Sequence, residues 1–249
     1  EAFPVDKPLR AKAEQILENW NKLMKIINDN FSGTLKENII KLHEHFEERI
    51  IEAPASGKPE YHNCFPGGYL DHVLRIIDTG LDVKQQFIKM GVEVQCSDSD
   101  VILAAMFHDL GKIGDLNNPY YIVQTDEWRR NKLNEFYTYS KDLENLSVSD
   151  RALWLLQHFD IKVSQEVWKA IKLADGMFDD GNTKLFRLGT NNQNILHYIV
   201  HFADWIATVA EKQHFVQEQN RPKKVKSLPK KKKKDNVEDL KNEFDKLFN

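Results

Sequence analysis

The segment FHDLGK, residues 107–112, places three chemically active side chains directly after the apolar run Val101 to Phe107. His108 offers an imidazole, Asp109 a carboxylate and Lys112 an ammonium. Imidazole and carboxylate groups bind divalent metals, whereas an ammonium can hold an anionic oxygen. Because a His-Asp pair arises easily by chance in a chain with nine histidines, its interpretation depends on further ligands elsewhere.

Such ligands lie on two other predicted helices. His72 follows a Gly-Gly turn, and His197, His201 and Asp204 are spaced i, i+4, i+7 on a long apolar helix, so that the last three face one way. Two neutral imidazoles and two carboxylates from these helices would form a site suited to Mn, Fe, Co, Ni, Zn or Mg. Such a metal lowers the pKa of bound water toward ~7, and Lys112, one turn beyond, would hold an anionic substrate oxygen.

The elements that must position these residues are predicted to be helical. Apolar residues recur with helical spacing in many segments, and no segment shows the alternation of a β-strand. Thr34 with Glu37, and Ser97 with Asp100, have the spacing of capping boxes, and Gly111 would end the helix before it. We therefore expect an all-α fold with helices over about 16–27, 35–50, 69–90, 97–107, 125–137, 149–159 capped by Ser149, 164–173 capped by Ser164, and 193–218.

His72, the pair His108-Asp109 and the distant Asp204, in this order, resemble the signature of the HD superfamily of metal-dependent phosphohydrolases. The strings HNCFPGGYLDH (62–72) and FHDLGK are similar to the branch containing HD-type exoribonucleases and signalling phosphodiesterases. The stretches 147–178 and 195–211 also resemble uncharacterised HD proteins of T-even-like bacteriophages. The resemblance covers about residues 58–212 and implies an HD-domain-like helical bundle with a metal site between helices.

The resemblance implies four metal ligands: His72, His108, Asp109 and Asp204. Asp109 and Lys112 are then the catalytic candidates, and Lys112, Arg75 and Asp175 are the candidates for substrate binding. Arg75 either faces the site as a phosphate contact or is a surface arginine. The general base is either Asp109 or Asp175, or the reaction needs none.

The chain departs from the two-metal members of the superfamily, which carry two more histidines between the His-Asp pair and the last Asp. Here only His158 and His197 fall in that interval, and Ala174-Asp175-Gly176 stands where relatives often have His-Asp-Gly. Whether a second metal binds is therefore left open. Three histidines are candidates for a second metal or for hydrogen bonds to the ligands, and otherwise for loop or core positions: His62, His158 and His201.

The predicted function is hydrolysis of a phosphate ester of a nucleotide, or of a short phosphoester derived from nucleic acid, by metal-activated water. Cleavage of either a monoester or a diester fits the residues. One alternative is an HD-fold di-iron oxygenase, although the missing histidines leave few ligands for two irons. A second alternative is a non-catalytic HD binding module tethered to a replication assembly, although the intact ligand set favours catalysis.

The charge distribution divides the chain. We expect N-terminal helices packed on the domain over 1–57, an HD phosphohydrolase domain over 58–220, a basic flexible linker over 221–235 and an amphipathic helix over 236–249. Residues 221–234 hold nine basic residues and no acid, whereas residues 1–220 carry a net charge of −9, so nucleic-acid binding would be confined to the linker. The last helix would dock on this domain, on a second copy of itself or on a protein partner, and its ending EFDKLFN loosely resembles peptides that bind sliding clamps.

The hydropathy and cysteine content suggest where the protein works. The longest apolar run is far shorter than the roughly 20 residues of a membrane span. Two cysteines, Cys64 and Cys96, are too few for a disulfide scaffold. We therefore expect a soluble protein with no membrane partner in the cytoplasm, which would be the host cytoplasm if a phage encodes the chain.

Overall fold

The computed structural model describes residues 8–176, 182–186 and 194–220. These residues are mostly α-helical, which confirms the all-α prediction. Residues 1–217 form one compact unit and residues 218–249 a second, and the predicted linker and last helix lie outside the described residues. The elements are α1 (Pro8–Asn30), α2 (Gly33–His45), α3 (Glu47–Glu52), α4 (Gly68–Lys89), α5 (Asp98–Phe107), the 3-10 helix η1 (Leu110–Ile113), β1 (Tyr121–Val123), α6 (Glu127–Lys132), β2 (Tyr137–Tyr139), α7 (Val148–His158), α8 (Gln165–Lys172), α9 (Thr183–Phe186) and α10 (Leu196–Asn220).

Serine side chains begin several of these helices. Ser97 accepts a hydrogen bond from the backbone N–H of Asp100, whose carboxylate accepts one from the backbone of Ser97, so the predicted capping box of α5 is confirmed. Ser164 caps α8 as predicted. Each cap satisfies backbone donors that the first helical turn leaves unpaired, and therefore fixes where the helix starts.

Two predicted helix starts are wrong by a short distance. The cap of α7 is Ser147, not Ser149. The capping box proposed for Thr34 and Glu37 is not formed, because α2 already begins at Gly33. The error at α7 is a shift of two residues between two serines near the start of the helix.

The chain contains a β-hairpin that its sequence pattern does not predict. Strands β1 and β2 pair antiparallel, with Tyr121 opposite Tyr139. The helix expected over 125–137 is correct only for α6, after which Asn134 adopts a φ of 56°, the left-handed conformation that commonly ends helices. Three-residue strands are too short for an alternating pattern to be recognised.

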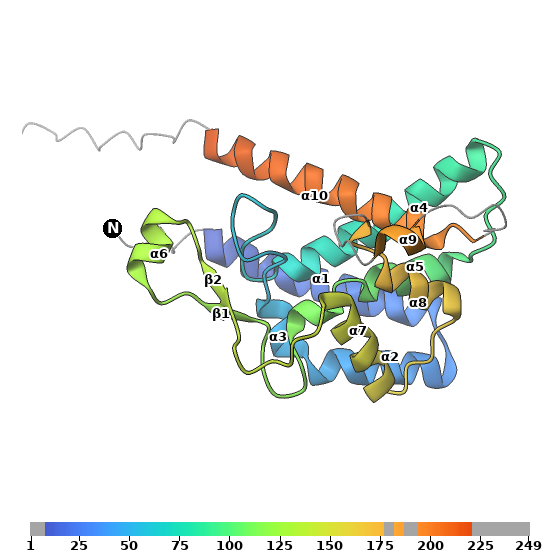
Figure 1. The fold of residues 1–249 in the computed structure, drawn as a ribbon, viewed down its shortest axis with the longest axis horizontal. Coiled ribbons are helices and arrows are strands. Elements are labelled where there is room, and N and C mark those ends of the chain that lie inside the picture. The colour runs from blue at the N-terminus through green and yellow to red at the C-terminus, as the bar shows by residue number, and fades with distance from the viewer. Residues whose placement is uncertain (1–7, 177–181, 187–193, 221–249) are drawn as a thin grey trace, which may run out of the picture. The chain divides into compact units, whose positions relative to one another are not determined.

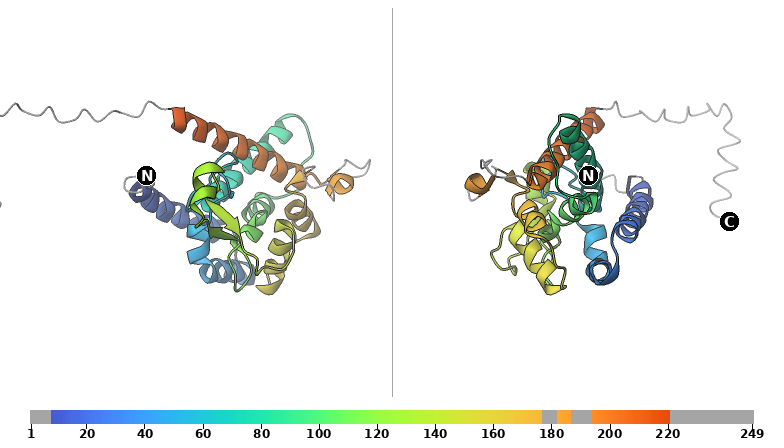
Figure 2. Two further views of the ribbon diagram at one scale, coloured as in Figure 1. Left: turned by 60° about the vertical axis from the view of Figure 1, so that its left-hand side comes forward. Right: turned by 90° about the vertical axis from the view of Figure 1, so that its right-hand side faces the viewer.

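Helix α5 lies at the centre of the compact unit and is buried from Val101 to Phe107. It packs against α4 on one side and α8 on another (Figure 1). Gly80 of α4 lies where α5 and α10 both come close, because a Cβ there would be 3.0 Å from Val101 Cγ1 and 3.8 Å from Ala203 Cβ. Helices α4, α5 and α10 therefore approach one another at this glycine, and the rotated views show α10, in orange-red, next to α4, in teal (Figure 2).

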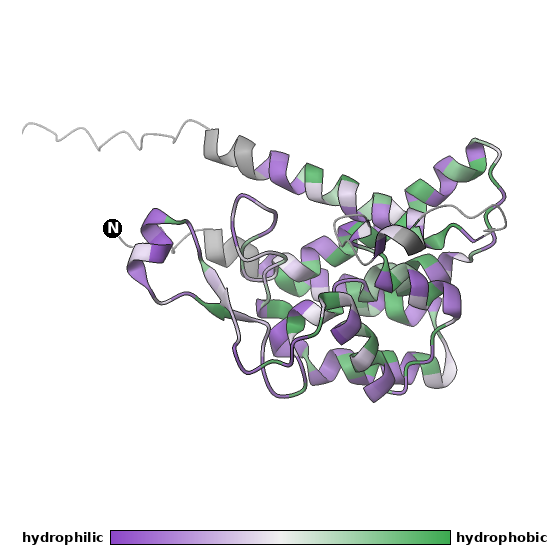
Figure 3. Cartoon of the chain, viewed as in Figure 1, coloured by the Kyte–Doolittle hydropathy of each residue, from purple (hydrophilic) through white to green (hydrophobic). Residues whose placement is uncertain are grey.

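The N-terminal helices cover a second face of α4. Helix α1 packs against α4 and α2, with Leu23 and Ile27 fully buried in the shared core. Apolar and polar residues alternate along α4 with the spacing of a helix that is buried on one side (Figure 3). Among the described helices, none is long and apolar enough to cross a membrane.

Candidate metal centre

Three helices bring the four candidate ligands into one cluster. His72 lies on α4, His108 and Asp109 follow the end of α5, and Asp204 lies on α10. His72 Nε2 is 3.3 Å from Asp204 Oδ1 and 3.7 Å from Asp109 Oδ2, and His108 Nε2 is 3.4 Å from Asp109 Oδ2. His72, His108 and Asp109 therefore lie close enough together to hold one metal ion, and Asp204 lies beside His72.

Hydrogen bonds fix which nitrogen of each imidazole faces the cluster. His108 Nδ1 lies 2.7 Å from the carbonyl oxygen of Ala105, and His72 Nδ1 lies 3.0 Å from Glu211 Oε2. A carbonyl or carboxylate oxygen only accepts, so both Nδ1 atoms donate. Each Nε2 is buried and has no hydrogen-bond partner among the described residues. Two unpaired buried nitrogens beside Asp109 form a cluster that could hold a metal ion.

The turn after α5 places Asp109 and Lys112 together. Asp109 leaves the helical conformation with φ of −107° and begins η1, and Lys112 Nζ lies 2.6 Å from Asp109 Oδ2. Gly111 allows this turn to lie flat against α7, because a Cβ at that position would be 2.1 Å from the carbonyl oxygen of Val148. The glycine is therefore required by a close approach of two backbones.

The charges of the cluster stabilise one another. Burial by itself would lower the pKa of His72, but the carboxylates of Glu211 and Asp204 outweigh burial and raise this pKa to about 10. Burial disfavours the Asp109 carboxylate, yet Lys112 and His108 hold its pKa well below its usual range. A field that attracts a proton to His72 Nε2 equally favours a divalent cation there in exchange for that proton.

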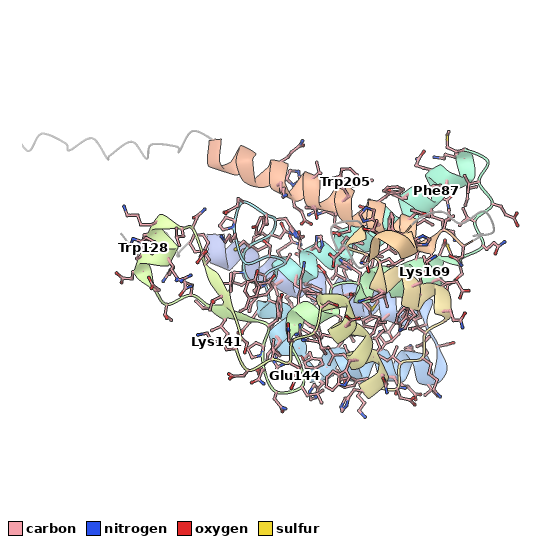
Figure 4. All side chains as sticks on the ribbon, viewed as in Figure 1. Phe87, Trp128, Lys141, Glu144, Lys169 and Trp205 are labelled. Atoms are coloured by element: carbon pink, nitrogen blue, oxygen red, sulfur yellow. The ribbon has the colours of Figure 1, made fainter. Side chains whose placement is uncertain are left out.

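Asp204 stands at the accessible edge of the cluster. Its side chain is 22% exposed, and the hydroxyl of Thr208 donates to its Oδ1 at 3.3 Å. The next residue, Trp205, is 55% exposed and projects from the outer side of α10 (Figure 4). Asp175 is also exposed, although neighbouring atoms partly shield its carboxyl group from water. This desolvation and the negative charge of Asp109 both raise the pKa of Asp175. Asp204 is therefore the most exposed of the four candidate ligands.

Glu211 is a member of the cluster that the sequence analysis missed. Its buried carboxylate lies 3.0 Å from His62 Nδ1, 3.0 Å from His72 Nδ1 and 3.0 Å from Arg75 Nε. Glu211 follows Asp204 by seven residues, two turns further along α10, so helical spacing alone places both carboxylates on one face. That spacing is the signal that would have revealed it.

The remaining predicted residues occupy varied positions. His62 bonds Glu211 and so contacts a partner of the ligands. Arg75 pairs with Asp71 at 3.0 Å as well as with Glu211, and its predicted contact with a phosphate stays a prediction. His158 is exposed and stacks on Trp154, on the outer face of α7. It does not join the cluster.

Two histidines of α10 point away from the metal ligands. His201 Nδ1 lies 2.9 Å from the carbonyl oxygen of Ala174, and its ring packs edge-on against Phe186 at 4.8 Å. His197 is buried beside Phe186 and Tyr198. Both rings therefore belong to packing around the segment after α8, and of the three residues spaced i, i+4, i+7, only Asp204 reaches His72.

Two groups of side chains in the described chain have metal-binding geometry. One comprises His72, His108 and Asp109, and the other His62, His72 and Glu211. In the second group each Nδ1 already donates to Glu211, so its polar atoms are satisfied. In the first group two Nε2 atoms lack partners, and the first group is therefore the better metal site.

Comparison with known proteins adds no further constraint. No family model, curated protein or solved structure matches this chain. The chemistry of the cluster must therefore be inferred from its own geometry.

Proposed function

We propose that this protein is a metal-dependent phosphohydrolase of the HD type, acting on a nucleotide or a short phosphoester. The observation that carries the proposal is the pair of buried, unpaired Nε2 atoms of His72 and His108 beside Asp109. Asp204 completes a set of two nitrogen and two oxygen ligands, which leaves coordination positions for water and substrate. A divalent ion held there would supply a nucleophilic water at neutral pH and a positive charge beside the phosphorus atom.

Lys112 is the residue best placed to bind the substrate. Its ammonium lies 2.6 Å from Asp109 Oδ2, and its side chain keeps 17% of its surface exposed. An ammonium has three donors, so Lys112 can hold Asp109 with one and a phosphoryl oxygen with another. Charge that builds up on that oxygen during hydrolysis would be stabilised by a donor already in position.

Aromatic residues beside Lys112 support a substrate with a planar group. Burial raises the pKa of the Tyr121 phenol, and the positive charge of Lys112 acts against this rise. The ring of Tyr139 lies 5.7 Å from that of Tyr121 and is 54% exposed. An accessible aromatic surface next to a phosphate-binding lysine is consistent with a nucleotide, because bases stack on such rings.

A phosphoester panel tests the proposal. Protein stripped with a chelator and reloaded with Mn²⁺ should retain the metal and hydrolyse nucleoside monophosphates or bis-p-nitrophenyl phosphate. Asp109→Asn should abolish hydrolysis, whereas Asp160→Asn, the same change at an exposed carboxylate, should not. If the reloaded wild-type protein hydrolyses no phosphoester, or if both variants match it, catalysis at this cluster is refuted.

A second pair of variants separates substrate binding from metal binding. Lys112→Met should reduce turnover by about 10²–10³, the usual loss when one stabilising donor is removed, with metal content unchanged. Lys162→Met changes a lysine that is 87% exposed and should have no effect. Loss of metal in Lys112→Met would contradict the role assigned to Lys112.

A further inference from the structure

Glu211 is a buried carboxylate that joins two histidines and an arginine. Its side chain is only 1% exposed. Its Oε2 lies 3.0 Å from both His62 Nδ1 and His72 Nδ1, and its Oε1 accepts from Arg75 Nε at 3.0 Å. A charge removed from water in this way requires several partners, and Glu211 has them.

We infer that Glu211 is the positioning residue that makes His72 a metal ligand through Nε2. A carboxylate accepts hydrogen bonds and donates none, so the proton of a neutral His72 must sit on Nδ1. The lone pair of that imidazole is then on Nε2, which lies beside Asp109 and Asp204. Carboxylates that bond the outer nitrogen of a ligating histidine fix its tautomer and raise its basicity.

The opposite tautomer would disable the site. If Nδ1 of His72 lacked an acceptor, the ring proton could reside on Nε2, which is 3.3 Å from Asp204 Oδ1. That proton would occupy the position of the metal and pair with a second ligand at the same time. Glu211 disfavours this neutral tautomer by holding a proton on Nδ1, so that the ring carries its lone pair on Nε2 once the other proton has left.

Other side chains hold Glu211 in the required orientation. Arg75 bonds Glu211 through Nε and Asp71 through its terminal nitrogen, and Asn63 also donates to Asp71 at 2.9 Å. The loop before α4, the first turns of α4 and the second half of α10 are therefore linked around one carboxylate. This arrangement assigns His62 and Arg75 to supporting Glu211.

The inference rests on the metal site of the proposed function, and metal affinity tests it separately from catalysis. Chelator-treated wild-type protein and Glu211→Gln are titrated with Mn²⁺ by calorimetry. We expect Glu211→Gln to bind Mn²⁺ about 10–100-fold more weakly, as is usual when a partner of a ligating histidine is lost. Glu135→Gln is the matched control, because Glu135 pairs with Lys58 and Arg129 at a different place and should keep wild-type affinity.

A spectroscopic measurement on the wild-type protein guards against misfolding of the variant. In Zn²⁺-loaded protein, long-range ¹H–¹⁵N correlation spectra should show His72 protonated at Nδ1 and coordinated through Nε2, with the signals assigned by their loss in His72→Gln. Coordination through Nδ1, or equal Mn²⁺ affinities of wild type and a folded Glu211→Gln, would overturn the inference. Metal binding as expected without phosphoester hydrolysis would refute only the proposed function, whereas a wild-type protein that binds no metal would refute both.

Discussion

Metal loading should raise the melting temperature of the protein, and the unpaired atoms of the cluster indicate by roughly how much. Two buried ring nitrogens of the cluster, His72 Nε2 and His108 Nε2, have no hydrogen-bond partner among the described residues. Each such atom costs about 1–3 kcal/mol, and a metal would remove both costs. A ligand present at 100 times its Kd stabilises the folded state by about 2.7 kcal/mol, which agrees with this range. For a chain of this size we therefore expect the Tm to rise by about 5–11 °C.

Differential scanning calorimetry with and without excess Mn²⁺ measures this shift, and two histidine variants locate its origin. His108→Ala removes one ligand and should abolish most of the shift. His158→Ala removes an exposed histidine of α7 that stacks on Trp154, and should leave the shift intact. If His108→Ala showed the full rise in Tm, the stabilising metal would bind elsewhere, and the assignment of the cluster would be refuted.

Two further predictions concern the scaffold. Gly111→Ala places a Cβ 2.1 Å from the carbonyl oxygen of Val148, so urea denaturation should show that the free energy of unfolding falls by more than about 3 kcal/mol. In the control Gly91→Ala the new Cβ meets no atom within 4 Å, and the free energy of unfolding should fall by only about 1 kcal/mol. Equal losses in the two variants would contradict the steric explanation. Burial lowers the pKa of His43 from 6.5 to about 4, although its hydrogen bond to the Ile39 carbonyl acts in the opposite direction. As the pH falls from 6.5 to 4, this histidine therefore takes up a proton in the unfolded chain before it does so in the folded one, and the free energy of unfolding decreases. His43→Gln should lack about 3 kcal/mol of this acid-induced loss in urea titrations at pH 7 and pH 4, and an unchanged pH dependence would show that His43 is not its source.

Local sequence information determined most of the helical scaffold and which candidate ligands stand at the end of α5. A helix records its buried face in the spacing of apolar residues, so the all-α class could be inferred without any tertiary contact. The cap at Ser97 depends on residues within one turn and was predicted correctly. The position of His108 and Asp109 at the end of the buried helix α5 has the same local origin.

Only the tertiary structure decided which side chains meet across the helices. His197, His201 and Asp204 share one helical spacing, yet His201 bonds Ala174 while Asp204 reaches His72. Helical spacing shows only that residues lie on roughly the same side of a helix. How α10 is rotated about its axis relative to α4 then decides which of these side chains reaches His72. The short β-hairpin likewise depends on pairing between segments that carry too few residues to show a pattern.

The role of Glu211 shows the same limit most clearly. Its partner His72 lies 139 residues earlier in the chain, so no local rule connects them. The sequence by itself determined that α10 carries carboxylates at Asp204 and Glu211, two turns apart on one face. The packing of α10 beside α4 decided that the imidazole ring of His72 lies between these two carboxylates. Its Nε2 therefore faces Asp204, and its Nδ1 faces Glu211.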